Sequence, residues 1–280
     1  MTSRRQFVRA LVAATGITDG VRLARHGVHR LKRVGLELYS VRDAMRADPD
    51  GTLAAVRRMG YDDVELLWSF GNFGRTPDQV LATLQRLGLR APSAHIAPEL
   101  LLSNWQVSLD TARHLGHSYL VVPSLPDETR NSLDAWRRWA DRFNQAGAAA
   151  RRSGIWLAFH NEPEHQRPID NVVPYDLFID HTDPEAVRLQ LDVGNMLLGG
   201  GDPFAYLARH RARYWSFHLK DVVADRSHDT ELGAGSFDFG RFLAAVQDLE
   251  RKPCYVEQEA APQPLISVQR DLRYLRDLRF

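Results

Sequence analysis

Short apolar stretches alternate with longer amphipathic segments along the chain from residue 33 onward. Each apolar stretch ends in polar or turn-forming residues, a pattern typical of β-strands that alternate with helices. Stretches such as Tyr119–Val122 show little polar alternation, as expected for parallel strands that are covered on both faces. The pattern predicts eight strands, over residues 34–39, 63–67, 90–96, 119–122, 155–159, 187–193, 214–219 and 254–256.

Helical periodicity fills the segments between these strands, and several predicted helix ends carry local signals. Gly60 follows the helix predicted over residues 50–59 and is expected to end it, whereas Thr76 and Pro77 provide an N-cap and a first-turn proline for the next helix. Further helices are predicted over residues 98–115, 133–152, 175–180, 237–249 and 265–278, with another that begins at Asp202-Pro203.

Eight strands, each followed by a helix, predict a single (β/α)8 TIM barrel over residues 33–280. The alternative is an open, doubly wound α/β sheet, for which we would expect a G-x-G-x-x-G phosphate loop after an early strand. The chain has no such motif in that position, since Gly199-Gly200-Gly201 follows the sixth predicted strand. The barrel is therefore the more economical interpretation.

Composition excludes several classes of protein. The 280 residues are 44% hydrophobic and 25% charged, which is ordinary globular composition and not that of a collagen, a coiled coil or a disordered chain. A net charge of +1 gives no overall attraction to nucleic acid or to an anionic membrane. Because Cys254 is the one cysteine, the chain can form neither an intramolecular disulfide nor a cysteine cluster for zinc.

Residues 1–32 are predicted to form an N-terminal extension. Its start, Ser3-Arg4-Arg5-Gln6-Phe7, is similar to a twin-arginine export signal, but the following stretch is only mildly apolar and is interrupted by Arg9. Two interpretations stay open: export to the periplasm by the twin-arginine route, or a cytoplasmic protein with a basic, amphipathic N-terminal helix. We expect no membrane span, because no apolar run reaches the roughly 20 residues required.

Residues capable of catalysis lie where the predicted strands end, which is where barrel enzymes place their active sites. Asp192 directly follows Leu191, and Glu257 stands between Val256 and Gln258. A carboxylate buried without a partner costs several kcal/mol, so each needs an ion pair, hydrogen bonds or a metal. The residues of this kind at strand ends are Glu37, Tyr39, Glu65, His95, His160, Asn161, Glu162, Asp192, His218, Lys220, Asp221, Glu257 and Glu259. Carboxylates together with imidazoles suit Mn, Mg, Co or Zn.

The order and spacing of these motifs resemble the sugar phosphate isomerase/epimerase group of the xylose isomerase-like barrel superfamily. The resemblance extends from about Val34 to the C-terminus. Its motifs are Gly35-Leu36-Glu37-Leu38-Tyr39-Ser40-Val41-Arg42-Asp43, Gly60-Tyr61-Asp62-Asp63-Val64-Glu65, Ser93-Ala94-His95, His160-Asn161, Leu191-Asp192-Val193-Gly194-Asn195, Phe217-His218-Leu219-Lys220-Asp221, Gly233-Ala234-Gly235-Ser236-Phe237-Asp238-Phe239 and Tyr255-Val256-Glu257-Gln258-Glu259.

The resemblance implies a divalent metal at the mouth of the barrel. In the related ketose 3-epimerases, Glu, Asp, His and Glu at the ends of the fifth to eighth strands bind the metal, and Asp192, His218 and Glu257 match the last three. At the fifth strand the epimerases have a glutamate that also exchanges a proton, whereas this chain has His160. We therefore expect His160 to act as ligand or base, with a carboxylate from Glu162 or the nearby Glu164 as the alternative.

The resemblance also implies a metal-dependent isomerase or epimerase that acts on a sugar, keto-sugar or polyol through an enediolate. Glu257 or a fifth-strand group would move the proton. Loss of a β-hydroxyl from the same enediolate would instead make the protein a lyase or hydratase of 3-keto-sugars or their glycosides. A sugar-binding barrel without catalysis is a further alternative. Substrate contacts are expected from Glu37, Tyr39, Glu65, His95, Asn195 and Lys220.

Some of these residues have a structural alternative: Glu37 and Glu65 could orient other polar groups inside the barrel, and Lys220 could form an ion pair with Asp221. The expected partners are a small carbohydrate and a second copy of the chain in a homo-oligomer. Nucleic acid is not expected. Apurinic endonucleases of this superfamily need a trinuclear zinc cluster and a basic surface. This chain is close to neutral, and too few of its remaining histidines fall at predicted strand ends to bind three zinc ions.

Overall fold

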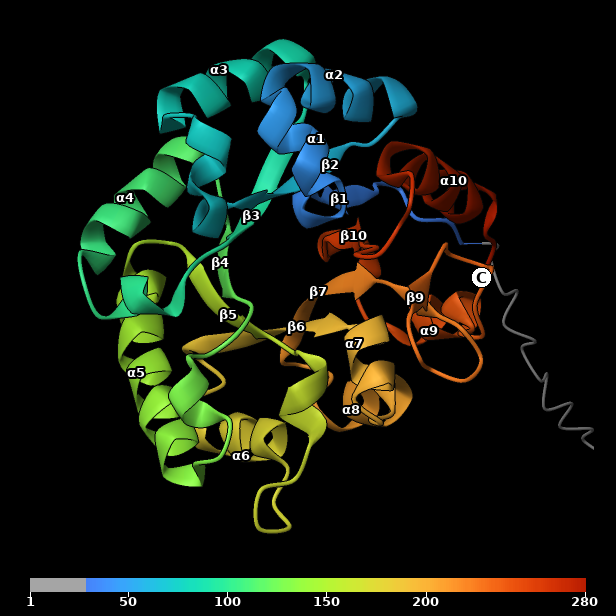
Figure 1. Cartoon of the computed structure of the whole chain (residues 1–280). Helices are drawn as coiled ribbons and strands as arrows, with labels where there is room; N and C mark the ends of the chain where they lie inside the picture. The colour runs from blue at the N-terminus through green and yellow to red at the C-terminus, as the bar shows by residue number, and fades with distance from the viewer. Residues whose placement is uncertain (1–28) are drawn as a thin grey trace, which may run out of the picture.

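Eight parallel strands close into a barrel in the computed structural model, which describes residues 29–280 (Figure 1). Closure occurs at Gly35, which pairs with Asp63 on one side and with Tyr255 on the other. The strands are β1 (Gly35–Glu37), β2 (Asp63–Leu67), β3 (Arg90–His95), β4 (Tyr119–Val122), β5 (Trp156–His160), β6 (Val187–Asp192), β7 (Tyr214–Leu219) and β10 (Cys254–Val256). The predicted (β/α)8 fold is confirmed, and β2, β4, β7 and β10 have the bounds that the sequence pattern predicts.

The helices form a ring around the strands (Figure 1). They are α1 (Arg42–Ala47), α2 (Pro49–Met59), α3 (Pro77–Leu87), α4 (Trp105–Leu115), α5 (Leu133–Arg152), α6 (Pro174–His181), α7 (Val193–Leu198), α8 (Pro203–Arg209), α9 (Phe239–Ala245) and α10 (Pro264–Asp277). Gly60 ends α2 in the left-handed conformation, with φ of 108°. Thr76 caps α3, and its side chain and that of Gln79 form a reciprocal capping box. Both predicted helix ends are therefore confirmed.

Two predicted helices are shorter in the structure than in the sequence analysis. The segment over residues 98–115 is divided into a short 3₁₀ helix, Pro98–Leu101, and α4, because Asn104 adopts a left-handed φ of 54° between them. The segment over residues 237–249 contains α9, which ends at Ala245, and Asp248 is left-handed beyond it. Asn tolerates the left-handed conformation that divides the first segment, whereas α9 ends because Val246 adopts extended backbone, with ψ of 119°.

The apolar core lies between the strands and the helices. Phe143 of α5 packs edge-on against Phe159 of β5, with ring centroids 5.5 Å apart, and against Phe178 of α6 at 4.9 Å. Inside the barrel, by contrast, several polar side chains are fully or almost fully buried, namely Glu65, Ser93, Gln190, His218 and Tyr255. Buried polar groups need hydrogen-bond partners, so this layer forms a fixed network beneath the barrel mouth.

A two-stranded antiparallel ribbon, which the sequence pattern does not predict, follows β7. It pairs β8 (Asp221–Val222) with β9 (Asp229–Thr230). The carboxylate of Asp221 accepts hydrogen bonds from the backbone N–H groups of Gly233 and Gly235, 2.9 and 3.2 Å away. Asp221 therefore fixes the loop over residues 231–237 and forms no ion pair with Lys220.

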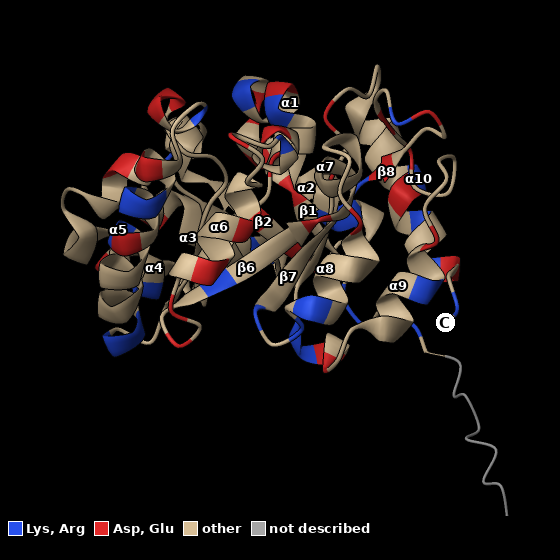
Figure 2. Ribbon diagram, turned by 90° about the horizontal axis from the view of Figure 1, so that it is seen from below, with Lys and Arg blue, Asp and Glu red and all other residues tan. Residues whose placement is uncertain are grey.

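The two ends of the described chain lie side by side, since His29 and Phe280 exchange two backbone hydrogen bonds. The twin-arginine motif predicted at the N-terminus falls in residues 1–28, outside the described residues. Across residues 29–280, no helix is both long enough and apolar enough to cross a membrane. Acidic and basic residues are both present along α5 (Figure 2).

Candidate metal centre

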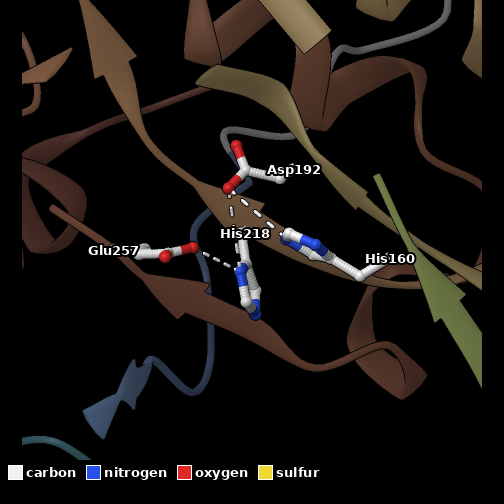
Figure 3. Close-up of side chains that lie close together, drawn as sticks. All are labelled: His160, Asp192, His218 and Glu257. Carbon is white, nitrogen blue, oxygen red and sulfur yellow. Dashed lines mark hydrogen bonds and ion pairs between the residues drawn. The ribbon is translucent and has the colours of Figure 1, made fainter. Parts of the chain in front are cut away.

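Four side chains converge at the carboxyl ends of adjacent strands (Figure 3). His160 ends β5, Asp192 ends β6, His218 lies near the end of β7, and Glu257 directly follows β10. In these parallel strands Asp192 is the register partner of His218, and His218 that of Tyr255. The register brings one ligand atom from each of the four side chains within 4.8 Å of the others. All four residues are at most 6% exposed.

Two of these side chains carry buried polar atoms without hydrogen-bond partners among the described residues. They are both ring nitrogens of His160 and the Oδ2 atom of Asp192. His160 Nε2 lies 3.5 Å from that Oδ2 atom, whereas the other carboxylate oxygen of Asp192 accepts a hydrogen bond from Asn195 N at 2.8 Å. Unpaired buried polar atoms are costly, and a divalent cation would satisfy them. Two imidazoles and two carboxylates are a suitable ligand set for such an ion.

His218 lies between two carboxylates. Its Nδ1 atom is 2.5 Å from Glu257 Oε2, and its Nε2 atom is 2.5 Å from Glu65 Oε2. Burial opposes a charge on the ring, but Glu257 and Glu65 outweigh it and raise the pKa of His218 well above its usual value. A metal-binding histidine commonly donates its other ring N–H to a carboxylate. Glu65 is placed to receive that hydrogen bond while Nδ1 faces the centre.

Glu65 is fully buried beneath the centre and accepts hydrogen bonds from Ser93 Oγ at 2.6 Å and from Gln190 Nε2 at 3.0 Å. Burial opposes its ionisation, but the charges of His95 and His218 prevail and lower the pKa of Glu65 to about 2. The structure thus places this predicted substrate contact inside the barrel, where it holds His218 and His95. The other buried residues of this support are Ser93, Gln190 and Tyr255. Of these, only Gln190 could have been found from the sequence, because it is a polar residue between two leucines of a predicted strand.

His95 lies beside the centre, with its ring centroid 5.3 Å from those of both His160 and His218. Its Nε2 atom is 2.9 Å from Gln190 Oε1 and 3.3 Å from Glu65 Oε2. Burial lowers the pKa of His95 to about 4, so its ring is neutral near pH 7. Glu65, His95 and His218 are also close enough to hold an ion, but their facing atoms are already joined to one another.

Glu37, at the end of β1, is fully buried, and its Oε1 atom has no hydrogen-bond partner within residues 29–280. Burial, and then the nearby charge of Glu257, raise the pKa of Glu37 well above its usual value. Tyr39 N donates to the other carboxyl oxygen. The Tyr39 side chain lies against the Phe70 ring, with centroids 5.8 Å apart, and beneath the Arg42 guanidinium.

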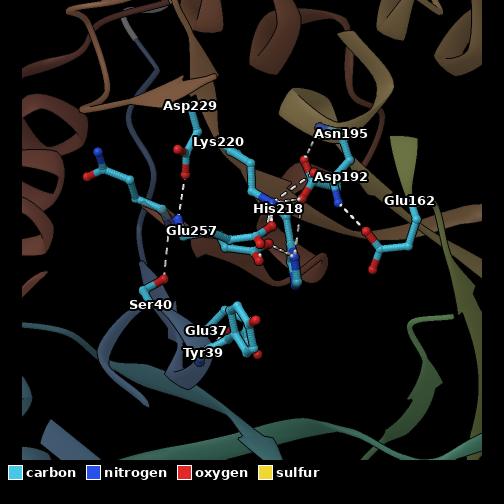
Figure 4. A network of polar contacts seen from close by, with 12 residues as sticks. Glu37, Tyr39, Ser40, Glu162, Asp192, Asn195, His218, Lys220, Asp229 and Glu257 are labelled. Atoms are coloured by element: carbon cyan, nitrogen blue, oxygen red, sulfur yellow. Dashed lines mark hydrogen bonds and ion pairs between the residues drawn. The ribbon is translucent and has the colours of Figure 1, made fainter. Parts of the chain in front are cut away.

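Lys220 is fully buried and brings its ammonium group into the centre (Figure 4). Its Nζ atom lies 3.0 Å from Asp192 Oδ2, 3.3 Å from Glu257 Oε1 and 2.5 Å from Glu259 Oε1. Burial disfavours the charge, but these carboxylates prevail and raise the pKa of Lys220 well above its usual value. Lys220 and His218 in turn hold the pKa of Glu257 well below its usual range, although burial opposes this.

Glu162 lies at the rim, with 24% of its side chain exposed and its Oε1 atom 3.6 Å from His160 Nδ1. Asn195 links it to the centre, since Asn195 Nδ2 donates to Glu162 Oε2 and Asn195 Oδ1 accepts from Lys220 Nζ, both at 2.9 Å. Burial by the surrounding atoms raises the pKa of Glu162 well above its usual value, although Lys220 opposes the shift. Glu164 instead lines a cavity of about 630 Å³ with Trp136.

A family model described as the xylose isomerase-like TIM barrel matches residues 53–278 of the chain. The chain belongs to this family. Within it, the arrangement described above supports a metal centre at the mouth of the barrel, formed by the side chains that the family resemblance singled out at the ends of β5, β6, β7 and β10. Their role as ligands stays a prediction.

Curated relatives include the inosose dehydratase of Lacticaseibacillus casei, which is 28% identical over 139 residues; the match covers 44% of this chain and 46% of the relative. The chain thus matches about half the length of such relatives. Among solved structures, a sugar phosphate isomerase/epimerase from Parabacteroides distasonis ATCC 8503 has a TM-score of 0.77 and 24% identity, and covers 88% of this chain and 98% of its own. The IolI protein, solved with a zinc atom, has a TM-score of 0.68 and 14% identity, with 86% and 95% covered. These two likenesses show the fold.

Proposed function

We propose that this protein is a divalent-metal-dependent dehydratase that removes water from a keto-sugar or a cyclic polyol ketone. The observation that carries the proposal is the convergence of His160, Asp192, His218 and Glu257 at the barrel mouth, where both ring nitrogens of the buried His160 make no hydrogen bond within residues 29–280. The inosose dehydratases among the relatives favour dehydration over the isomerisation or epimerisation expected from the sequence.

His160, Asp192, His218 and Glu257 would hold the metal. A divalent ion there would polarise a substrate carbonyl and lower the pKa of the neighbouring C–H group. Glu65 fixes the ring of His218 from below, and Asn195 N fixes one oxygen of Asp192, so both ligands are oriented before substrate binds. Such preorganisation keeps the ligand atoms from reorienting during the reaction.

Glu162 is the group that we assign to proton transfer. It lies next to His160, keeps part of its side chain open to the mouth and is outside the proposed ligand set. In the dehydration, the C–H bond next to the carbonyl breaks and its proton passes to the Glu162 carboxylate. The electron pair forms the new C=C bond while the β C–O bond breaks. The departing hydroxyl takes the proton from Glu162 and leaves as water.

The same first step would also serve an isomerase or epimerase, in which the proton returns to carbon instead of leaving with the hydroxyl. The two activities therefore differ in product and not in proton removal. Product analysis is the measurement that separates them, and water loss is the result that we expect.

The test is deuterium exchange and product analysis with 3-keto-sugars and cyclic polyol ketones in deuterated water. We expect exchange and an unsaturated ketone with metal-loaded protein, and neither after chelation nor with Asp192→Asn. Asp134→Asn, on the exposed first turn of α5, is the matched control and keeps full activity. Exchange without water loss would replace the dehydratase by an isomerase or epimerase. Tight metal binding with no exchange would contradict enolate chemistry, and a wild type that binds sugar but no metal would be a binding protein.

A further inference from the structure

The ammonium group of Lys220 lies against the same carboxylates that would hold the metal. Lys220 Nζ is 3.0 Å from Asp192 Oδ2, an atom that makes no hydrogen bond among the described residues, and 3.3 Å from Glu257 Oε1 (Figure 4). A dication and an ammonium that share these oxygens repel each other and compete for them. This relationship matters only if the proposed metal centre exists, so the inference rests on the proposed function.

The backbone is shaped to keep Lys220 in this position. Gly194 lies directly beside the aliphatic stem, and a Cβ atom on Gly194 would lie 2.5 Å from Lys220 Cγ and 2.7 Å from Cδ. Any larger residue there would push the stem aside. The stem therefore lies in a groove that the missing side chain of Gly194 leaves open, and the residue is fully buried.

Glu259 is the carboxylate nearest to the ammonium and lies outside the proposed ligand set. Its Oε1 atom lies 2.5 Å from Lys220 Nζ, and 42% of its side chain is exposed at the rim. Asn195 Oδ1 accepts from the same ammonium at 2.9 Å. Glu259 is outside the groups of His, Asp and Glu side chains that are close enough to bind an ion, and Asn195 offers the ammonium only a neutral amide oxygen. They can therefore retain Lys220 while Asp192 and Glu257 turn to a metal.

We propose that Lys220 is an internal counter-cation that competes with the divalent metal for Asp192 and Glu257, and that Glu259 draws the ammonium away from them. In the metal-free protein, Lys220 neutralises the buried carboxylates. When metal binds, the ammonium keeps its contacts with Glu259 and Asn195 and gives up those with Asp192 and Glu257. Lys220 thus sets how tightly the centre holds its metal, a role separate from any contact with substrate.

The test is the dissociation constant of Zn²⁺ and Mn²⁺, measured by competition with a fluorescent chelator. Lys220→Met keeps an aliphatic stem in the Gly194 groove and removes the charge, so metal should bind at least about tenfold more tightly. Glu259→Gln should weaken binding by about tenfold, because the ammonium loses its second partner. Glu250→Gln, an exposed glutamate of the 3₁₀ helix Leu249–Arg251, is the matched control and should change nothing.

The double variant decides whether Glu259 acts through Lys220. With Lys220→Met already present, Glu259→Gln should change the dissociation constant by less than about threefold, so that the two effects are coupled. Equal effects of Glu259→Gln in both backgrounds would overturn this role of Glu259. Unchanged or weaker metal binding by Lys220→Met would overturn the competition itself.

Failure of this inference is distinguishable from failure of the proposed function. If the wild type binds metal and exchanges protons but Lys220→Met binds no more tightly, the metal enzyme stands and the counter-cation does not. If neither the wild type nor Lys220→Met binds metal, both are wrong. If circular dichroism shows that Lys220→Met does not fold, Glu259→Gln alone decides, and an unchanged dissociation constant contradicts the proposal.

Discussion

Glu65 lies beneath His218, with Oε2 of the glutamate 2.5 Å from Nε2 of the imidazole. This contact leaves Nδ1 of His218 facing Glu257 and Asp192. Because Glu65 orients the ring, we predict that Glu65→Gln weakens divalent-metal binding by about 10- to 100-fold, the range typical of such supporting carboxylates. The measurement is the metal dissociation constant by chelator competition, together with circular dichroism to show that the fold is retained.

A matched variant separates the effect of the Glu65 carboxylate on metal binding from the effect of the hydrogen bonds around it. Ser93→Ala removes one hydrogen bond to Glu65 and leaves the contact with His218 intact, so its effect on metal binding should be less than about fivefold. Normal metal affinity in Glu65→Gln would show that the ring of His218 is held without this carboxylate.

A substitution of Asp192 tests a proposed ligand directly. We predict that Asp192→Asn lowers the metal retained after dialysis by more than about tenfold and abolishes proton exchange, because an amide oxygen is neutral and the Lys220 ammonium then loses a counter-charge. Elemental analysis of the dialysed protein is the measurement. Asp134→Asn again provides the control, and full metal content in Asp192→Asn would remove Asp192 from the ligand set.

The strand ends that form the candidate centre could be predicted from sequence because all parallel strands of a barrel end at one rim. Asp192, His218 and Glu257 each follow a recognisable apolar run, so their meeting needs no knowledge of exact register. Lys220 is two residues beyond His218, and the alternation of strand side chains turns both inward while Asp221 turns away. This periodicity was in the sequence and argues against an ion pair between neighbours.

Contacts across the barrel could not be predicted in the same way. Glu65 and Gln190 are 125 positions apart, and Ser93 and Tyr255 are 162 positions apart, so only the closed barrel brings these pairs together. Which side chains meet depends on the stagger of the strands, which local patterns leave open. The break at Asn104 was missed for a different reason: a single left-handed residue interrupts a segment whose periodicity is helical on both sides.

Gly60 is a helix end that the sequence predicted, and its effect on the free energy of unfolding can be measured by substitution. It ends α2 with φ of 108°, and the space around it is open: a Cβ atom there would meet Leu272 Cδ2 at an ordinary 3.7 Å. The strain in Gly60→Ala is therefore of the backbone and not of packing. We predict a loss of about 1 to 2 kcal/mol in the free energy of unfolding, measured by urea denaturation. Gly154→Ala, also with positive φ and open space, should behave alike; a neutral effect at both would contradict the argument.

Asp271 of α10 gives the fold a dependence on pH away from the metal centre. Its side chain is 1% exposed, one oxygen accepts from Leu232 N at 2.7 Å, and the other has no partner among residues 29–280. Burial, and then the nearby charge of Glu231, raise the pKa of Asp271 to about 7, although the Leu232 N–H opposes the shift. The unfolded chain has the ordinary value of 3.8. At a pH between these two pKa values, the folded protein therefore binds one proton more than the unfolded chain.

The sign of the effect follows from this difference. The contribution of Asp271 to stability is complete below about pH 4 and is lost as the pH rises through about 7. Relative to Asp271→Asn, which is neutral throughout and keeps an oxygen for Leu232, the wild type should lose about 2 kcal/mol of unfolding free energy between about pH 5 and pH 8. Urea titrations of both proteins across this range measure the difference. A difference that stays constant with pH would mean that the Asp271 carboxyl is already ionised at about pH 5, and that the Leu232 N–H outweighs burial.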